Sequence, residues 1–412
     1  MGKELKIAYL TPHIRCDPNR TQFQRPKHLS LKNALFVFTG KETVLPKEIG
    51  KRVRIIRGPL KFGRFSARPL FSIWCVYKVL GLHRKYRFDL VYSTYDCYSS
   101  VSAAILKIIG FNWVADIWDH PESWKGIREK SIKKRLLVNV PRTMFCQIIK
   151  RALRYADLVI SVIPSAIVKF HINPKRIFAV TNGVDLSITK PRGLKRSNAE
   201  FRVFYVGFLM RERGLDLILH AMGMLKGRTE GLKLILVGDA RGEDLNYLDR
   251  TVKLLGLEKQ VKFHGRLNHR KVLDLIEGSD VCLCALPAGE LFDIAYPIKI
   301  FEYMAMGKAV VATKLKGVSE VITDEVDGLL VKPGDTREMA DAVFRIYKNP
   351  VLRERLETSA KRTAKKYDWK IVNGKINEKL AEFYDQKKLG NKVIVSEERF
   401  LHGDDEHVST EG

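Results

Sequence analysis

The sequence predicts an α/β protein with two doubly wound domains, each built around a parallel sheet. Its 412 residues accommodate two domains at about 150 residues each. In both halves, short apolar runs of strand length alternate with longer amphipathic stretches, as expected for βαβ units. The alternation breaks in a polar segment, residues 186–200, that contains Pro191 and Gly193. Because such a break is typical of a linker, the domains are expected at residues 1–190 and 191–370.

The first domain is expected to contain seven strands, each a short apolar run between polar or turn-forming residues. These runs are Lys6–Leu10, Leu35–Thr39, Val53–Arg57, Asp89–Ser93, Trp113–Trp118, Leu158–Val162 and Ile177–Thr181. Amphipathic spacing between them predicts helices at Pro69–Tyr86, Tyr98–Ile109 and Ile132–Tyr155.

The second domain repeats this plan. Its expected strands are Phe201–Val206, Leu232–Val237, Val261–His264, Val281–Leu286 and Ala309–Ala312. Helices are expected at Leu215–Leu225, Thr336–Lys348 and Val351–Lys366. A last helix, from about Lys370 to Lys388, is expected to cross back onto the first domain within residues 371–392. Residues 393–412 are predicted to be disordered, because the end of the chain is acidic and poor in apolar residues.

The composition argues against several classes of protein. No run approaches the roughly 18 uncharged apolar residues of a membrane-spanning helix, and the apolar run Ile7–Leu10 is too short for a signal peptide. The cysteines are scattered, and only Cys282 and Cys284 lie close together. This spacing indicates neither a disulfide framework nor a zinc site, so a reducing cytoplasm is predicted.

Positive charge is concentrated in the first half of the chain. Residues 1–190 hold 35 Lys or Arg against 12 Asp or Glu, whereas the remaining residues hold 38 against 34. Residues 51–87 contain eleven basic residues, no acidic residue and interleaved aromatic residues that include Phe62, Phe65, Phe71, Trp74 and Tyr77. Such a field attracts an anionic membrane surface, nucleic acid or a phosphate-bearing substrate. The alternative for Leu70, Phe71 and Trp74 is that they form the buried face of a helix.

A first candidate site follows the strand Phe201–Val206. There the segment Gly207–Gly214 connects the strand to a helix, and a strand, a glycine-flanked turn and a helix N-terminus together favour anion binding. Arg211 and Arg213 in this turn carry forked donors that suit a diphosphate.

A second candidate site is the segment Tyr296–Ala312. Pro297 suits the first turn of a helix and Gly307 suits its C-terminal cap. Lys299 and Glu302 are three residues apart and therefore share a face near the helix start. A carboxylate there can accept hydrogen bonds from the two hydroxyls of a ribose, while the ammonium can meet a phosphate.

The run Pro297–Thr313 resembles the nucleotide-sugar-binding helix of retaining glycosyltransferase family 4, also called glycosyl transferases group 1. Its pattern is that of the subgroup Pro-x-Lys-x-x-Glu-Tyr-Met-Ala-x-Gly-Lys. Further segments agree in order and spacing: Asn182–Asp185, Leu236–Asp239, Val261–Gly265, Gly317–Ile322 and Gly328–Val331. In the first domain the match is thinner and rests on Asn182–Asp185, Ala156–Ile160 and Asp116–Glu122. The resemblance implies a GT-B architecture, in which two Rossmann-like domains face each other across a cleft.

The resemblance also implies roles for single residues. Arg213 stands at the family's phosphate-binding Lys, and Glu302 at its ribose-binding Glu. Two positions depart from the family pattern, because Phe208 replaces an Arg and Ile294 replaces a Glu. Lys299 is expected to supply part of the missing positive charge. The predicted donor site therefore consists of Gly207, Arg211, Arg213, Lys299 and Glu302.

The first domain is expected to contribute the reacting groups and the acceptor site. Asp119 and His120 lie in a segment that resembles the family's donor-sugar contact, and they are the predicted catalytic residues. The family's Gly-Gly turn after the first strand is absent, and a polar loop extends through Asn19 to Arg25 instead. Arg25 in this loop is the predicted acceptor-side residue.

The implied reaction is retaining transfer of a hexose-type sugar from a UDP- or GDP-sugar, with no metal ion and no other cofactor. Arginine, lysine and a helix N-terminus take over the stabilisation of the leaving diphosphate that a divalent ion provides elsewhere. The acceptor is expected to be lipid-linked or a cell-envelope glycan. The basic first domain is expected to hold the enzyme on the cytoplasmic, inner face of the membrane.

Three other functions fit parts of the sequence. A sugar-nucleotide epimerase with the same scaffold would bind the donor without using an acceptor. A nucleic-acid-binding protein would account for the net charge of +27, although no nucleic-acid-binding motif accompanies the charge. A regulatory binding module without activity would account for Phe208 and Ile294.

Overall fold

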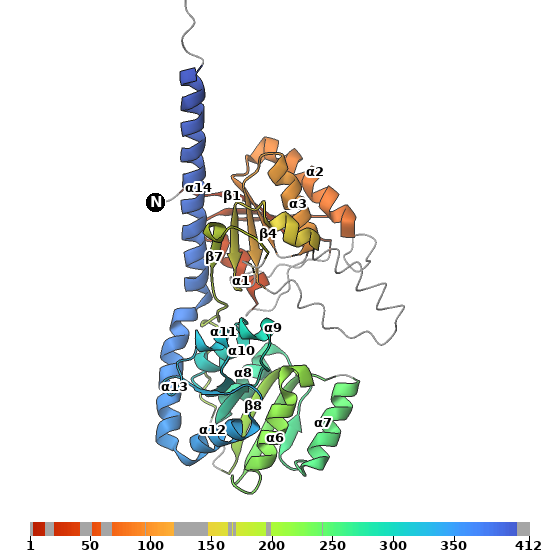
Figure 1. The fold of residues 1–412 in the computed structure, drawn as a ribbon, viewed down its shortest axis with the longest axis vertical. Helices are drawn as coiled ribbons and strands as arrows, with labels where there is room; N and C mark the ends of the chain where they lie inside the picture. Colours follow the sequence, from red (N-terminus) through yellow and green to blue (C-terminus); the bar gives the residue numbers. More distant parts are fainter. Residues whose placement is uncertain are drawn as a thin grey trace, which may run out of the picture.

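The computed structural model contains two separate parallel sheets, which lie one above the other along the long axis of the molecule (Figure 1). It describes residues 3–12, 20–41, 52–58, 68–94, 96–118, 147–163, 167, 170–194, 199–240 and 242–401. Helices pack against both sheets, as the alternation of strands and helices predicts. The predicted α/β fold with two doubly wound domains is confirmed.

The first sheet has seven strands in the order β3-β2-β1-β4-β5-β6-β7, and every neighbouring pair is parallel. The strands are β1 (Lys6–Leu10), β2 (Ala34–Thr39), β3 (Val53–Arg57), β4 (Leu90–Thr94), β5 (Trp113–Ile117), β6 (Leu158–Ser161) and β7 (Ile177–Ala179). Strand order changes direction between β1 and β4. Sheets of this class place their ligands at the carboxyl ends of the strands beside such a switch point.

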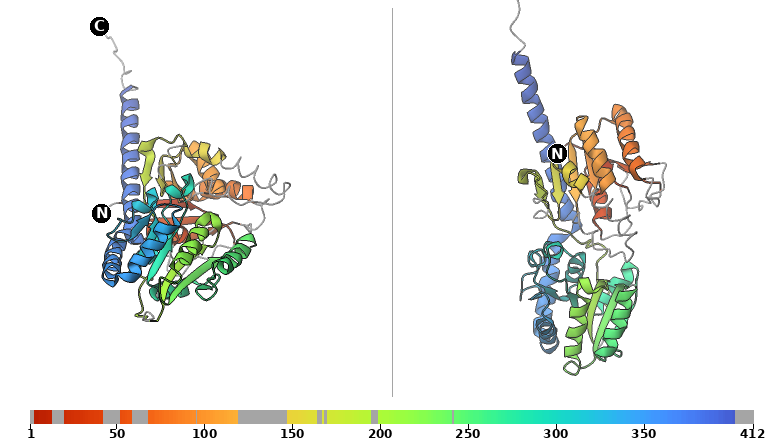
Figure 2. Two further views of the ribbon diagram at one scale, coloured as in Figure 1. Left: turned by 60° about the horizontal axis from the view of Figure 1, so that its bottom comes forward. Right: turned by 45° about the vertical axis from the view of Figure 1, so that its right-hand side comes forward.

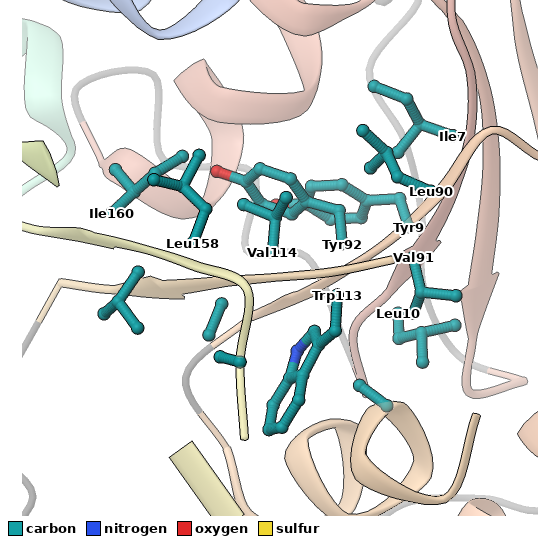
Figure 3. Close-up of a cluster of buried hydrophobic side chains, with 14 of the residues drawn as sticks. Ile7, Tyr9, Leu10, Leu90, Val91, Tyr92, Trp113, Val114, Leu158 and Ile160 are labelled. Atoms are coloured by element: carbon teal, nitrogen blue, oxygen red, sulfur yellow. The ribbon is translucent and has the colours of Figure 1, made fainter. Parts of the chain in front are cut away.

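Large side chains fill both faces of the first sheet (Figure 3). Tyr9 and Tyr92 lie on one face and stack with their ring centroids 5.1 Å apart. Leu10 and Trp113 lie on the other face. The indole Nε1 of Trp113 donates a hydrogen bond to Ser93 over 2.8 Å, so this buried polar group is satisfied.

Three helices of the first domain are α1 (Thr21–Leu29), α2 (Arg68–Tyr86) and α3 (Cys97–Ile108). Helices α2 and α3 pack against each other, and Asp96 caps the N-terminus of α3. The helix expected at Ile132–Tyr155 is present over residues 147–153, and its earlier part lies outside the described residues.

The second sheet has six parallel strands in the order β10-β9-β8-β11-β12-β13. They are β8 (Phe201–Phe208), β9 (Leu232–Asp239), β10 (Val261–Phe263), β11 (Val281–Cys284), β12 (Ala309–Thr313) and β13 (Leu329–Val331). Its helices are α6 (Leu215–Leu225), α7 (Glu243–Leu254), α8 (His269–Glu277), α9 (Glu290–Asp293), α10 (Ile298–Ala305), α11 (Lys316–Ser319), α12 (Thr336–Lys348) and α13 (Pro350–Ala364). The switch point of this sheet lies between β8 and β11.

The last helix, α14 (Trp369–Leu401), returns from the second sheet to the first and runs along the side of the first domain (Figures 1 and 2). Trp369, Ile376 and Leu380 are fully buried in the core of the first sheet. Lys387 also donates a hydrogen bond to Asp157 at the start of β6, over 2.8 Å. The C-terminal segment is therefore an integral part of the first domain.

Three features differ from the sequence-based expectation. Residues 21–29 form α1, where a polar loop is expected. The segment Leu329–Val331 is an edge strand that was not among the expected strands. Helix α14 continues to Leu401, so residues 393–401 are helical where disorder is predicted, and residues 402–412 lie outside the described part of the chain. Within the described residues, no helix has the length and apolar character needed to span a membrane.

Candidate functional site

The candidate site lies at the carboxyl end of β8, beside the switch point of the second sheet. A 3-10 turn, η4 (Arg211–Arg213), follows β8 and leads into α6 through Gly214. Gly214 has φ 84°, and a Cβ added there would lie 1.6 Å from the carbonyl oxygen of Ala285. Only glycine therefore allows this turn to pack against the end of β11.

Lys299 lies directly beside Gly207. The Lys299 Nζ atom is 2.9 Å from the position that a Cβ of residue 207 would occupy, so a side chain there would displace the ammonium group. The same Nζ atom lies 3.9 Å from the ring centroid of Tyr205, in cation–π contact. The structure thus brings together two residues that the sequence assigns to different motifs, one on β8 and one on α10.

Arg213 is the second cation at this position. Its guanidinium lies 5.5 Å from the ring centroid of Phe208 and 5.7 Å from that of Phe292, between β8 and α9. Both Arg213 and Lys299 act electrostatically on Cys284 at the end of β11: burial raises the pKa of this thiol, and the two cations partly oppose that rise. Two of the three predicted phosphate-binding side chains, Lys299 and Arg213, therefore lie beside the neighbouring residues Gly207 and Phe208 at the end of β8.

Arg211 has different surroundings. Its exposed guanidinium hydrogen-bonds to Asp216 over 3.3 Å and lies 4.6 Å from the ring centroid of Tyr247. The hydrogen bond and the charge of Asp216 raise the pKa of Arg211. Arg211 is thus held by side chains of α6 and α7, whereas Arg213 is held by Phe208 and Phe292.

Glu302 is nearly buried, with 7% of the residue exposed, one helical turn after Lys299 on α10. Its Oε1 atom lies 2.8 Å from Nε2 of His269, the first residue of α8. His269 is not among the site residues predicted from the sequence. The sequence does contain one local indication of where α8 begins: Asn268 is a residue of the kind that caps helices, and its side chain accepts a hydrogen bond from Lys271 N. This indication places His269 at the start of a helix but does not reveal its contact with Glu302.

The strand end predicted to hold the catalytic residues is only partly described. Asp119 and His120 follow β5 but lie outside the described residues. Asp116, near the end of β5, is fully buried and accepts hydrogen bonds of 2.6 Å from Arg25 Nε and from the Tyr92 hydroxyl.

Arg25 occupies an interior position on α1 rather than an acceptor site. It has no exposed surface, and its Nη1 atom donates a second hydrogen bond, of 2.5 Å, to Asn373 on α14. A guanidinium without exposed surface cannot contact an acceptor in this conformation. The structure instead assigns Arg25 to anchoring β5 and α14 through Asp116 and Asn373.

In the described part of the chain, no group of three or more His, Cys, Asp or Glu side chains is arranged to hold a metal ion.

Residues 188–363 match the family model for glycosyl transferases group 1. Alpha-D-kanosaminyltransferase of Streptomyces kanamyceticus is 32% identical over 166 residues, which are 40% of this chain and 41% of that protein. Phosphatidyl-myo-inositol mannosyltransferase of Mycobacterium leprae is 29% identical over 184 residues, 45% of this chain and 46% of that protein. The chain spans about half the length of the curated relatives it matches.

The fold is also found among solved structures, over most of the chain. The Anabaena protein HepE, solved in complex with UDP, superposes with a TM-score of 0.69 at 20% identity, over 92% of this chain and 100% of that one. At this identity the similarity concerns the fold alone. Residues 188–363 are therefore similar to the glycosyl transferases group 1, and the two parallel-sheet domains of the chain have the GT-B fold.

Proposed function

We propose that this chain transfers a hexose-type sugar from a UDP- or GDP-linked donor to an acceptor, with retention of the anomeric configuration and without a metal ion. One observation carries the proposal: Lys299 and Arg213 lie beside the neighbouring residues Gly207 and Phe208 at the end of β8, and Glu302 lies one helical turn from Lys299. Two cations and a nearly buried carboxylate on adjacent elements suit a diphosphate linked to a ribose.

The proposed donor site combines residues from the turn η4, which precedes α6, with residues from helix α10. Arg213 and Lys299 stabilise the negative charge that develops on the diphosphate as the sugar leaves, and the N-terminus of α6 adds the positive end of its dipole. Gly207 lets the diphosphate approach the strand end closely, because it has no side chain beside Lys299. Glu302 accepts hydrogen bonds from the ribose hydroxyls.

The relatives support the finer parts of this proposal. HepE has been solved with UDP, which favours a nucleotide-sugar donor here. The mannosyltransferase of Mycobacterium leprae is named for a phosphatidyl-linked acceptor, which favours a lipid-linked or cell-envelope acceptor. We assign Asp119 and His120 to the reacting sugar, because they follow Trp118 just after β5, whose residue Asp116 is anchored by Arg25.

The test of the proposal is donor-nucleotide affinity. Glu302→Ala should weaken binding of UDP or GDP by on the order of 2 to 3 kcal/mol, the loss expected when hydrogen bonds to a charged acceptor are removed. Titration calorimetry measures this directly. Glu258→Ala is the matched control. Glu258 is an exposed glutamate in the turn before β10, which is an edge strand of the second sheet. Equal affinities in wild type and Glu302→Ala would contradict the assignment.

The metal-free part of the proposal makes a separate prediction. Nucleotide release from the donor in the presence of acceptor should continue unchanged in excess EDTA, because Arg213 and Lys299 supply the charge that a divalent ion supplies elsewhere. The same assay with added manganese is the control. Turnover that EDTA abolishes and manganese restores would show that the enzyme requires a metal.

The outer face of α2 supports attachment to an anionic membrane at the cytoplasmic, inner surface. Leu70, Ile73 and Tyr77 are 51%, 67% and 70% exposed, and the helical period places them on one stripe. Arg84 and Lys85, further along the same helix, are also exposed. An exposed apolar stripe bordered by basic residues is the pattern of helices that lie in a membrane interface.

The aromatic residues of this region divide between the two explanations considered for them. Phe71 is buried, and Trp74 packs on Phe71 and Phe38 with ring centroids 5.8 and 6.3 Å apart, so these two residues serve the core. Tyr77 and Leu70 face outwards. Phe62 and Phe65 lie outside the described residues.

A further inference from the structure

The contact between His269 and Glu302 joins two elements that are far apart in the sequence. His269 opens α8 directly after its cap Asn268, and Glu302 lies in the middle of α10. The side chains are 25% and 10% exposed, and the Nε2 and Oε1 atoms are 2.8 Å apart. Helices α8 and α10 are both anchored in the core by buried apolar residues, which are Val272, Leu273, Ile276, Ile300, Phe301 and Met304.

The direction of this hydrogen bond follows from the chemistry of the partners. An ionised carboxylate has no proton to give, so the His269 Nε2–H group donates and Glu302 Oε1 accepts. A glutamate side chain has three rotatable bonds, and the last of them is soft. The bond from a ring fixed at a helix start therefore restricts the rotation of the carboxylate before any ligand binds.

We propose that His269 is a positioning residue for the nucleotide ribose: it holds the Glu302 carboxylate in the orientation that accepts the ribose hydroxyls. This inference rests on the proposed function, in which the ribose of the donor binds Glu302. His269 acts through Glu302 and pre-organises the site. Its removal therefore reduces recognition of the ribose hydroxyls specifically, and leaves the part of the affinity that comes from the diphosphate.

The experiment compares two ligands on a set of variants. The ligands are UDP and 2′,3′-dideoxy-UDP, with GDP and 2′,3′-dideoxy-GDP as the second pair, and calorimetry gives the ratio of their dissociation constants. For the wild type this ratio should be about tenfold or more, since the hydroxyls bond to a charged group. In Glu302→Ala it should fall to about one, because the acceptor is gone.

The His269 variants separate a positioning role from a structural one. His269→Phe keeps a planar ring and removes the donor, so the ratio should fall to about a third of the wild-type value or less. His269→Gln places an amide N–H near the position of Nε2 and should restore the ratio. His269→Ala provides the same comparison if the phenyl ring is not accommodated.

Each outcome decides between specific alternatives. If His269→Phe and His269→Ala weaken both ligands by the same factor, or leave the ratio at its wild-type value, the positioning role is overturned. If Glu302→Ala keeps the wild-type ratio, or if the wild type binds neither nucleotide pair, the proposed function itself fails. A ratio that collapses in Glu302→Ala and His269→Phe and returns in His269→Gln supports both.

Discussion

At the scale of single residues, two carboxylates of the first domain, Asp185 and Asp96, illustrate how burial and hydrogen bonds compete in setting a pKa. Burial alone would raise the pKa of Asp185, but hydrogen bonds from Ser187, Lys27 and Gln24 outweigh burial and lower it to about 2. At Asp96 burial prevails over the hydrogen bonds from the start of α3, and the pKa rises to about 6. The same chemical group is therefore stabilised in its charged form at one site and destabilised at the other.

The raised pKa of Asp96 predicts a pH dependence of stability. The unfolded chain releases this proton near pH 3.8, whereas the folded chain keeps it until about pH 6. Between these values the folded state binds more protons, so the free energy of unfolding should decrease as pH rises, by up to about 3 kcal/mol. Asp96→Asn keeps an oxygen for the helix cap and cannot ionise. Urea unfolding of both proteins from pH 4 to 7 should show their stabilities diverging, and parallel curves would refute the prediction.

At the scale of elements, the segment Asn182–Asp185 is the point where the two domains and α14 meet. Val184 forms a β-bridge with Asp368, just before α14, and Asn182 donates a hydrogen bond of 2.8 Å to the carbonyl oxygen of Tyr296, just before α10. The two domains are thus connected here by a hydrogen bond from a side chain to a backbone carbonyl, which lies next to the donor-site helix. A change in this segment should affect both domains.

Two glycine substitutions near this junction should have opposite effects. A Cβ at Gly183 would lie 2.6 Å from the carbonyl oxygen of Tyr367, so Gly183→Ala must move the backbone, at a cost of roughly 1 to 3 kcal/mol. A Cβ at Gly374, inside α14, would meet nothing within 4 Å. Gly374→Ala should therefore stabilise the protein by about 0.5 to 1 kcal/mol, because alanine favours helix. Urea midpoints measure both effects, and equal shifts of the same sign would contradict the argument.

At the scale of the whole molecule, the charge asymmetry and the position of α2 both indicate which side of the molecule would face an anionic membrane. The excess of basic residues belongs to the first half of the chain, and α2 lies on the outside of the first domain, away from the second sheet (Figure 2). A membrane bound at α2 would therefore contact the first domain and leave the donor site of the second domain accessible to water-soluble nucleotides.

Vesicle sedimentation tests this arrangement. The protein should sediment with phosphatidylglycerol-rich vesicles at low salt, less at high salt, and not with phosphatidylcholine vesicles. Arg84→Glu/Lys85→Glu should weaken binding by about 2 kcal/mol or more, since each basic residue at an anionic surface contributes about 1 kcal/mol. Arg250→Glu/Lys253→Glu on α7 changes the net charge equally and should have little effect. If both double variants lose vesicle binding to the same extent, the membrane attraction comes from the net charge of the protein and not from α2.

The sequence by itself determined the elements whose pattern is local. β1 and β3 have their predicted bounds, and α6 and α12 begin and end at the predicted residues, because apolar periodicity and turn residues act over a few positions. The spacing of Lys299 and Glu302 on one helix was equally evident, since it depends only on the period of α10.

Only the tertiary structure decided the identity of α1 and the partners of its polar residues. The polar residues Gln24 and Arg25 are not expected on the buried face of a helix, yet both are buried. Their hydrogen-bond partners are Asp185 and Asp116, which are 161 and 91 residues away in the chain. These partners come together only when the chain folds, so the local sequence does not reveal them. The pairing of His269 with Glu302 depends in the same way on two helices brought together by the sheet. The sequence determines where a helix or strand forms, but long-range packing decides which polar side chains can be buried and which residues complete a site.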